Sequence, residues 1–233
     1  MVPGTPLAAH PGARLTCLLL APSPDWVVLE IATGALLRSS LEEEESSELL
    51  AGDPLTALLL VLGEELGPSD PARPEAVVLS DVVDSPAPRR RSLKPLLEQL
   101  VAPQSDQPLL GVVGPSLAYG DLDGARPSVS VLSPERGRVV FAGERRLMAH
   151  FRIGPVSHAL PVSHGLIGWL QRGQLPVSTG TTAKRGGSTR KAKRVGPLGP
   201  AMEPAVPVRA VVGLDRPAEG QVRKVLLGVV PVA

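Results

Sequence analysis

The sequence of 233 residues contains one cysteine and very few aromatic residues. A single cysteine excludes an internal disulfide and a cysteine-based zinc site. Because Cys17 lies in the apolar run 15–20, we predict a buried thiol, since a reactive cysteine needs an electropositive, partly exposed setting. Phe, Trp and Tyr together make up only 2% of the chain, so the core must be formed mainly by aliphatic side chains.

The sequence also lacks a hydrophobic run long enough to cross a membrane. Its longest apolar run covers residues 55–63 and ends at Glu64, whereas a spanning helix needs roughly 20 residues. The apolar run 15–21 is too short for a signal peptide, and no basic segment precedes it. We therefore expect a soluble, cytoplasmic protein with no membrane partner.

Several common functional motifs are missing. The sequence has no Gly-x-Gly-x-x-Gly after a strand, no phosphate-binding loop ending in Gly-Lys-Ser/Thr, no Gly-x-Ser-x-Gly, no His-Glu-x-x-His and no Cys-x-x-Cys. These absences exclude the commonest nucleotide-binding and hydrolase classes, but not all enzymes. We expect no cofactor and no metal site, and the sequence leaves open whether the protein is an enzyme.

In the N-terminal half, the patterns predict helices packed on a mixed sheet. Runs rich in Leu and Val at 14–21 and 26–32 predict a β-hairpin. Asp53-Pro54 followed by leucines at helical spacing as far as Leu66 predicts a buried helix. A turn at Thr33-Gly34 is expected to lead into residues 35–39. The remaining predicted elements are strands at 76–79 and 108–113, a capped helix at 41–50, and a helix capped by Ser92 that ends near Val101.

The C-terminal half has a different pattern. Alternating residues at 128–132, 138–142 and 146–153 predict antiparallel strands, with Met148, His150 and Arg152 on one face of the last. A helix at 163–172 and a hairpin formed by 206–214 and 222–230 follow. The predicted fold class is α/β or α+β: a mixed sheet with packed helices in the N-terminal half, and mainly antiparallel β structure in the C-terminal half.

Charge is divided between the two halves. Residues 1–135 contain 8 Lys and Arg against 19 Asp and Glu, a net charge of −11, whereas residues 136–233 contain 16 against 4, a net charge of +12. Such asymmetry fits a charged partner for one half, and it equally fits two halves that pack on each other. We divide the chain into an acidic part, 14–113, and a basic part, 126–233, which could also form one continuous domain.

The most distinctive feature is a basic run within residues 176–204, a stretch rich in Gly, Thr and Pro that we predict to be a flexible loop. The run contains six cations in eleven residues and no acid: Lys184, Arg185, Arg190, Lys191, Lys193 and Arg194. Such a run can follow a phosphate backbone and gain affinity by counterion release. It contains no aromatic residue that could stack on bases, and a solvated loop is the alternative.

A second group of candidates consists of histidines and aspartates. His150, His158 and His164 fall within fifteen residues. Asp121 and Asp123, separated by one residue, lie earlier in the chain. Histidine with a carboxylate can form a base or metal site if the fold brings them together. Asp121 and Asp123 are equally explained by a turn between strands, and the histidines by ordinary polar positions.

Three functional hypotheses follow. The first is a non-catalytic accessory protein whose basic loop contacts nucleic acid or an acidic protein surface. The second is an enzyme with a His/Asp pocket between the two halves. The third is a structural protein that self-associates through its oppositely charged halves.

Overall fold

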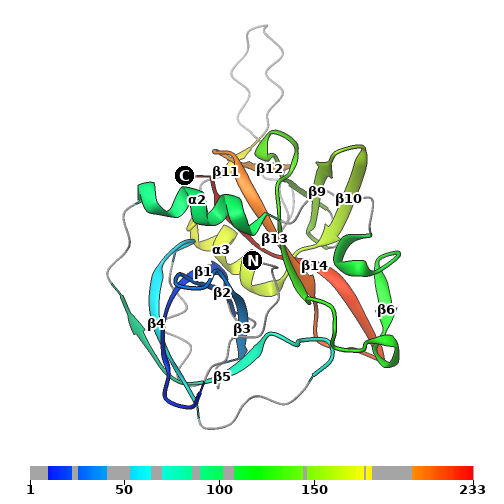
Figure 1. Cartoon of the computed structure of the whole chain (residues 1–233). Coiled ribbons are helices and arrows are strands. Elements are labelled where there is room, and N and C mark those ends of the chain that lie inside the picture. The colour runs from blue at the N-terminus through cyan, green and yellow to red at the C-terminus, as the bar shows by residue number, and fades with distance from the viewer. Residues whose placement is uncertain are drawn as a thin grey trace, which may run out of the picture.

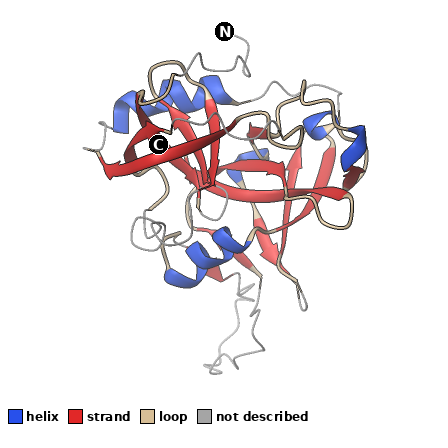
Figure 2. Ribbon diagram, turned by 90° about the horizontal axis from the view of Figure 1, so that it is seen from below, coloured by secondary structure: helices blue, strands red, loops and turns tan. Residues whose placement is uncertain are grey.

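The computed structural model describes residues 10–22, 26–40, 53–63, 70–85, 90–101, 108–143, 146–175, 177–179 and 201–232. Strands make up 48% of the structure and helices 16%. The predicted α/β or α+β class is therefore wrong, because the N-terminal half is a β-barrel and not a mixed sheet with packed helices. Within the described ranges the only α-helices are α2 (Arg90–Leu100) and α3 (His164–Arg172). Figure 2 shows the strands in the middle of the molecule and the helices at its periphery.

The N-terminal strands form a closed barrel in the order β1-β2-β3-β5-β4 (Figure 1). Neighbouring strands pair antiparallel, except β3 and β5, which are parallel. The predicted hairpin is confirmed as β1 and β2. The barrel strands are β1 (Arg14–Ala21), β2 (Trp26–Glu30), β3 (Leu36–Ser40), β4 (Ala57–Leu62) and β5 (Ala76–Asp84).

The predicted helix after Asp53-Pro54 is wrong, because its central leucines form β4. Leu58, Leu60 and Leu62 are buried, whereas Leu59 and Val61 between them are half-buried. A short run of leucines satisfies helical spacing and strand alternation together, so pairing with β1 and β5 decides between them. The predicted helix at 41–50 lies outside the described residues.

Two open sheets follow the barrel. The five-stranded sheet has the order β10-β9-β8-β12-β11, and the four-stranded sheet has the order β6-β14-β13-β7. Strand β14 contacts both β1 of the barrel and β10 of the five-stranded sheet, so it joins the parts of the molecule. The strands are β6 (Ser116–Ala118), β7 (Val129–Leu132), β8 (Val140–Ala142), β9 (Met148–Ile153), β10 (Val156–Pro161), β11 (Val177–Thr179), β12 (Met202–Pro204), β13 (Val208–Leu214) and β14 (Gln221–Pro231).

The prediction for the C-terminal half holds in most elements. Strands β7, β8 and β9, helix α3 and the hairpin of β13 and β14 lie where the sequence places them. Ser163 caps α3 by accepting a hydrogen bond from the Leu166 backbone amide, and Gly173 ends it with a left-handed φ of 71°. The strand expected at 108–113 is instead the 3-10 turn η1 (Leu109–Gly111), because Leu110 and Gly111 both have positive φ.

Two hydrophobic clusters form the core. On β1, Cys17 and Leu19 point into the larger cluster, which also contains residues of the five-stranded sheet and α3. Leu18 and Leu20 point into the second cluster, between the barrel, helix α2 and the four-stranded sheet. Because both faces of β1 are buried, its sequence is a continuous apolar run and not an alternation.

A buried polar network connects the barrel to the four-stranded sheet. Arg38 of β3 is 2% exposed, and its Nη1 donates to the Leu214 carbonyl at 2.8 Å and to Ser128 Oγ at 3.1 Å. The backbone amide and the hydroxyl of Ser128 donate to the two carboxylate oxygens of Glu75, at 2.6 and 2.5 Å. Glu75 immediately precedes β5, so the network spans the two sheets.

Candidate functional site

The basic run Lys184–Arg194 lies outside the described residues, but the strands on either side of it are described. Strand β11 is an edge strand of the five-stranded sheet and pairs with β12, with Thr179 directly opposite Met202. Both strands fall within the predicted loop 176–204, so the ordered sheet extends further than the sequence suggests. The described strands on either side of residues 180–200 are therefore neighbours in this sheet.

The same sheet has one face toward solvent. His150 pairs with Val140 on β8 and with Ala159 on β10, and Arg152 pairs with Ser157. Paired residues share a face, so these side chains lie together. Four residues of these strands are exposed: His150, Arg152, Ser157 and Ala159. Ala149 and Phe151, on either side of His150 in the chain, are buried. We call the exposed side, with Arg138, Val140, His150, Arg152, Ser157 and Ala159, the outer face.

A groove of about 550 Å³ crosses this outer face. Three arginines and one glutamate, Glu135, are the charged groups in its lining. The lining residues are Glu135, Arg136, Arg138, Val140, His150, Phe151, Arg152, Ser157, His158 and Ala159. Its volume falls within the range of ligand pockets, roughly 300–1,000 Å³.

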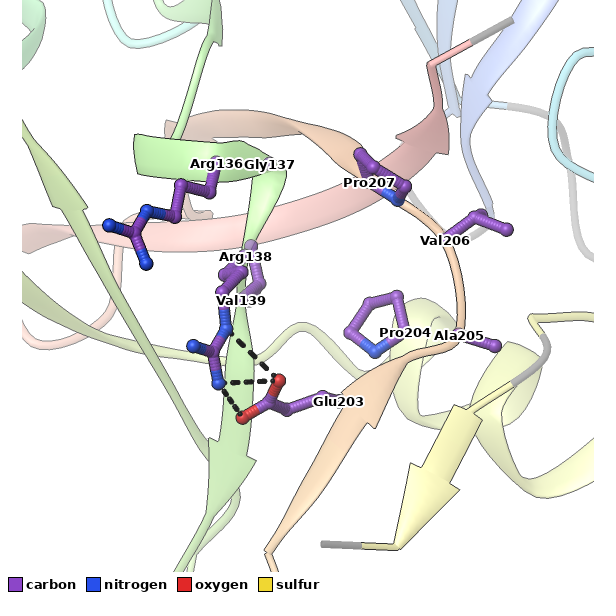
Figure 3. A pocket seen from close by; sticks show the side chains of 9 residues that line it. All are labelled: Arg136, Gly137, Arg138, Val139, Glu203, Pro204, Ala205, Val206 and Pro207. Carbon is purple, nitrogen blue, oxygen red and sulfur yellow. Dashed lines mark hydrogen bonds and ion pairs between the residues drawn. The ribbon is translucent and has the colours of Figure 1, made fainter.

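The three arginines differ in how firmly they are paired. Arg138 forms a bidentate pair with Glu203 of β12, with its Nη2 2.8 Å from Oε1 and 3.0 Å from Oε2 (Figure 3). Arg152 lies 3.8 Å from Glu135, and both side chains are more than half exposed. Arg136 has no carboxylate within ion-pair distance among the described residues, and Figure 3 shows its side chain pointing away from Glu203.

The backbone holds Arg136 in place. It belongs to the 3-10 turn η3 (Glu135–Gly137), where its φ of 56° is left-handed and unfavourable for a residue with a Cβ. The next residue, Gly137, also has positive φ, and a Cβ there would lie 2.6 Å from Cβ of Pro207. Close packing of Pro207 on Gly137 therefore fixes the turn that presents Arg136 to solvent.

Of the predicted histidines, only His150 and His158 line the groove, and they lie on opposite faces of the sheet. His158 pairs with the buried Phe151, and the two rings stack with centroids 5.3 Å apart. Burial lowers the pKa of His158, and the positive charge of Lys224 lowers it further. His158 is therefore directed toward the core, whereas His150 faces solvent.

The other His/Asp candidates lie elsewhere. His164 is the first residue of α3, and Asp121 ends the 3-10 turn η2 (Tyr119–Asp121). Asp123 accepts a hydrogen bond from the Ala125 backbone amide, which is the ordinary role of aspartate in a turn. None of the three lines the groove, and the described residues contain no group of three His, Cys, Asp or Glu side chains placed to hold a metal.

Cys17 is buried, as the sequence predicts. Burial raises the pKa of its thiol to about 12, and the negative charge of Glu30 adds to this shift. The thiolate is the reactive form, so Cys17 is a structural residue of the barrel core.

The sequence does not indicate the three arginines as a group. Arg152 lies on the polar face of its strand as predicted, and Arg136 and Arg138 lie before β8, Arg136 in a turn with positive φ. Their approach to Arg152 depends on the register in which β8 pairs with β9, with Val140 opposite His150, and the predicted turn between these strands does not specify that register.

No protein-family model matches this chain, and neither does any curated protein or solved structure. Among the described helices, neither has the length and apolar character needed to cross a membrane.

Proposed function

We propose that this is a cytoplasmic, non-catalytic accessory protein that binds nucleic acid through Lys184, Arg185, Arg190, Lys191, Lys193 and Arg194. The observation that carries the proposal is the density of this run: six cations in eleven residues, without one acidic residue. Each cation that neutralises a phosphate releases counterions, and this gain in entropy supplies affinity without sequence specificity.

The described strands on either side of the segment that contains the run support the proposal. Strands β11 and β12 are paired in the five-stranded sheet, so Thr179 and Met202 lie opposite each other. The outer face of that sheet adds the exposed guanidinium groups of Arg138 and Arg152, whose side chains are 59% and 56% exposed. The basic half of the chain thus has exposed cations on the outer face of the five-stranded sheet as well as in the run 184–194.

The test is a binding titration of the full chain with a fluorescent 20-base-pair duplex and a fluorescent single-stranded RNA at 50 and 200 mM salt. We expect micromolar or tighter binding at low salt and a loss of about tenfold or more at the higher salt. Changing the six cations to Gln should abolish binding. The control changes six uncharged residues in and beside the run to Ser and should leave binding intact: Thr182, Ala183, Gly186, Gly187, Thr189 and Ala192.

Two results would contradict the proposal. Absence of binding at 50 mM salt would remove nucleic acid as a partner. Equal competition by poly-glutamate and by the unlabelled duplex would show that the run recognises any polyanion, and would make an acidic protein surface the better partner.

A further inference from the structure

We propose that the groove on the outer face of the five-stranded sheet is a second contact surface for the phosphate backbone of the same nucleic acid, formed by Arg136, Arg138 and Arg152. This inference rests on the proposed function but uses different residues, all of them in described parts of the chain. It adds a subsite on a paired sheet to the cations of the run 184–194.

The geometry places the three guanidinium groups at one end of the sheet. Arg138 precedes Val140 by two residues, and Arg152 follows His150 by two residues, while Val140 and His150 are directly paired. Both arginines therefore lie on the same face and toward the same end. Arg136 extends from the adjoining turn, and all three line one groove.

The charge of the groove favours an anion. Its lining contains three arginines and one glutamate, and with Glu203, which pairs with Arg138, the net charge of these five side chains is 3 − 2 = +1. Arg136 is unpaired among the described residues, and the 3.8 Å separation of Arg152 from Glu135 is too long for a hydrogen bond. These two arginines can bind a phosphate without breaking a close ion pair, whereas Arg138 first has to leave Glu203.

The chemistry of the outer face favours phosphates over bases. Guanidinium groups match phosphate oxygens with two parallel hydrogen bonds. Besides the exposed imidazole of His150, the other side chains of the face are small or aliphatic, namely Val140, Ser157 and Ala159, and the aromatic ring of Phe151 is turned into the core. Because the face exposes no Phe, Trp or Tyr ring for stacking, the groove should hold mainly the backbone and show little base preference.

The experiment compares three forms of the full chain with the same fluorescent duplex: wild type, Arg136→Gln/Arg152→Gln, and the control Arg14→Gln/Arg223→Gln. Arg14 on β1 and Arg223 on β14 are exposed arginines outside the groove, so the control removes the same charge. Two lost phosphate contacts should reduce the slope of log K against log salt by about 1.8. The Arg136/Arg152 variant should then lose about tenfold more affinity at 50 mM salt than at 200 mM.

Two further variants test the same surface. Arg136→Lys/Arg152→Lys keeps both charges and should retain most of the wild-type slope. Glu203→Gln releases Arg138 and should steepen the slope by about 0.9, the value for one added phosphate contact. Far-UV circular dichroism and urea midpoints establish that each variant is folded.

The outcomes separate this inference from the proposed function. If wild type binds and the six-cation variant does not, but the Arg136/Arg152 variant keeps the wild-type slope, the groove is not a contact surface and the proposed function stands. An equal reduction of the slope in the Arg14/Arg223 control would also overturn the inference, because it would reflect net charge alone. If wild type fails to bind, both proposals fall.

Discussion

At the scale of single residues, burial shifts the pKa of two basic side chains, Lys224 and His158, downward. Lys224 is 8% exposed and donates from Nζ to the Val112 carbonyl at 2.7 Å, while burial lowers its pKa. His158 lies near this amine and stacks on Phe151, so burial and the charge of Lys224 both favour its neutral form. Such groups make the stability of the protein depend on pH.

His158 should make the protein less stable in acid. Its folded-state pKa is below the ordinary 6.5, so the unfolded chain binds more protons below that pH and stability falls as pH decreases through this range. His158→Phe keeps a ring against Phe151 and cannot be protonated. Urea midpoints measured from pH 7.5 to pH 5 should show a stability difference, variant minus wild type, that grows as pH falls. A difference that stays constant would show that His158 does not have a lowered pKa.

At the scale of elements, strand β14 contacts the barrel, the five-stranded sheet and helix α3. Its close approach to β1 of the barrel requires a glycine, Gly228. A Cβ at Gly228 would lie 2.3 Å from the Leu20 carbonyl oxygen and 2.9 Å from Cβ of Ala21, both on β1. Real Cβ atoms do not approach backbone oxygens so closely, so only glycine lets the barrel rest on β14.

Gly228→Ala should therefore destabilise the protein by about 1–3 kcal/mol, the usual cost of overpacking a core that has to shift. The matched control is Gly120→Ala, because a Cβ at Gly120 meets nothing within 4 Å and its φ is not positive. We expect that control to change the free energy of unfolding by less than about 0.5 kcal/mol. Chemical denaturation of both variants is the measurement, and equal stabilities would mean that β1 and β14 are not in this contact.

At the scale of the whole molecule, the acidic and basic parts of the chain share one core. The larger cluster contains Trp26 of the barrel and Trp169 of α3, together with residues of both open sheets. The network of Arg38, Ser128 and Glu75 adds buried hydrogen bonds between the barrel and the four-stranded sheet. A shared core and a shared network favour a single cooperative unit.

The two tryptophans allow a direct test of cooperativity. Trp169→Phe leaves fluorescence from Trp26 in β2, and Trp26→Phe leaves fluorescence from Trp169 in α3. In each variant the urea midpoint by fluorescence should coincide with the midpoint by far-UV circular dichroism. Adding Arg38→Met should lower both midpoints together and reduce the free energy of unfolding by about 2 kcal/mol, because it leaves buried acceptors without their donor. Separate midpoints would show that the barrel and the sheets are independent domains.

Local patterns in the sequence determined several features of this protein. The hairpin of β1 and β2, the capped helix α3, the final hairpin and the buried Cys17 follow from apolar runs, capping residues and turn residues that act within a few positions. The basic run Lys184–Arg194 is likewise a property of the sequence alone, and it carries the proposed function.

Only the tertiary structure decided the fold class and the groove. Leu58, Leu60 and Leu62 fit a helix and a strand equally, and only pairing with β1 and β5 makes them part of a barrel. Arg138 and Arg152 meet because β8 pairs with β9 in the register that puts Val140 opposite His150, and the predicted turn between these strands does not set that register. The physical reason is the same in both cases: strand pairing and register depend on partners outside the segment, and hydrophobic periodicity within one segment does not identify them.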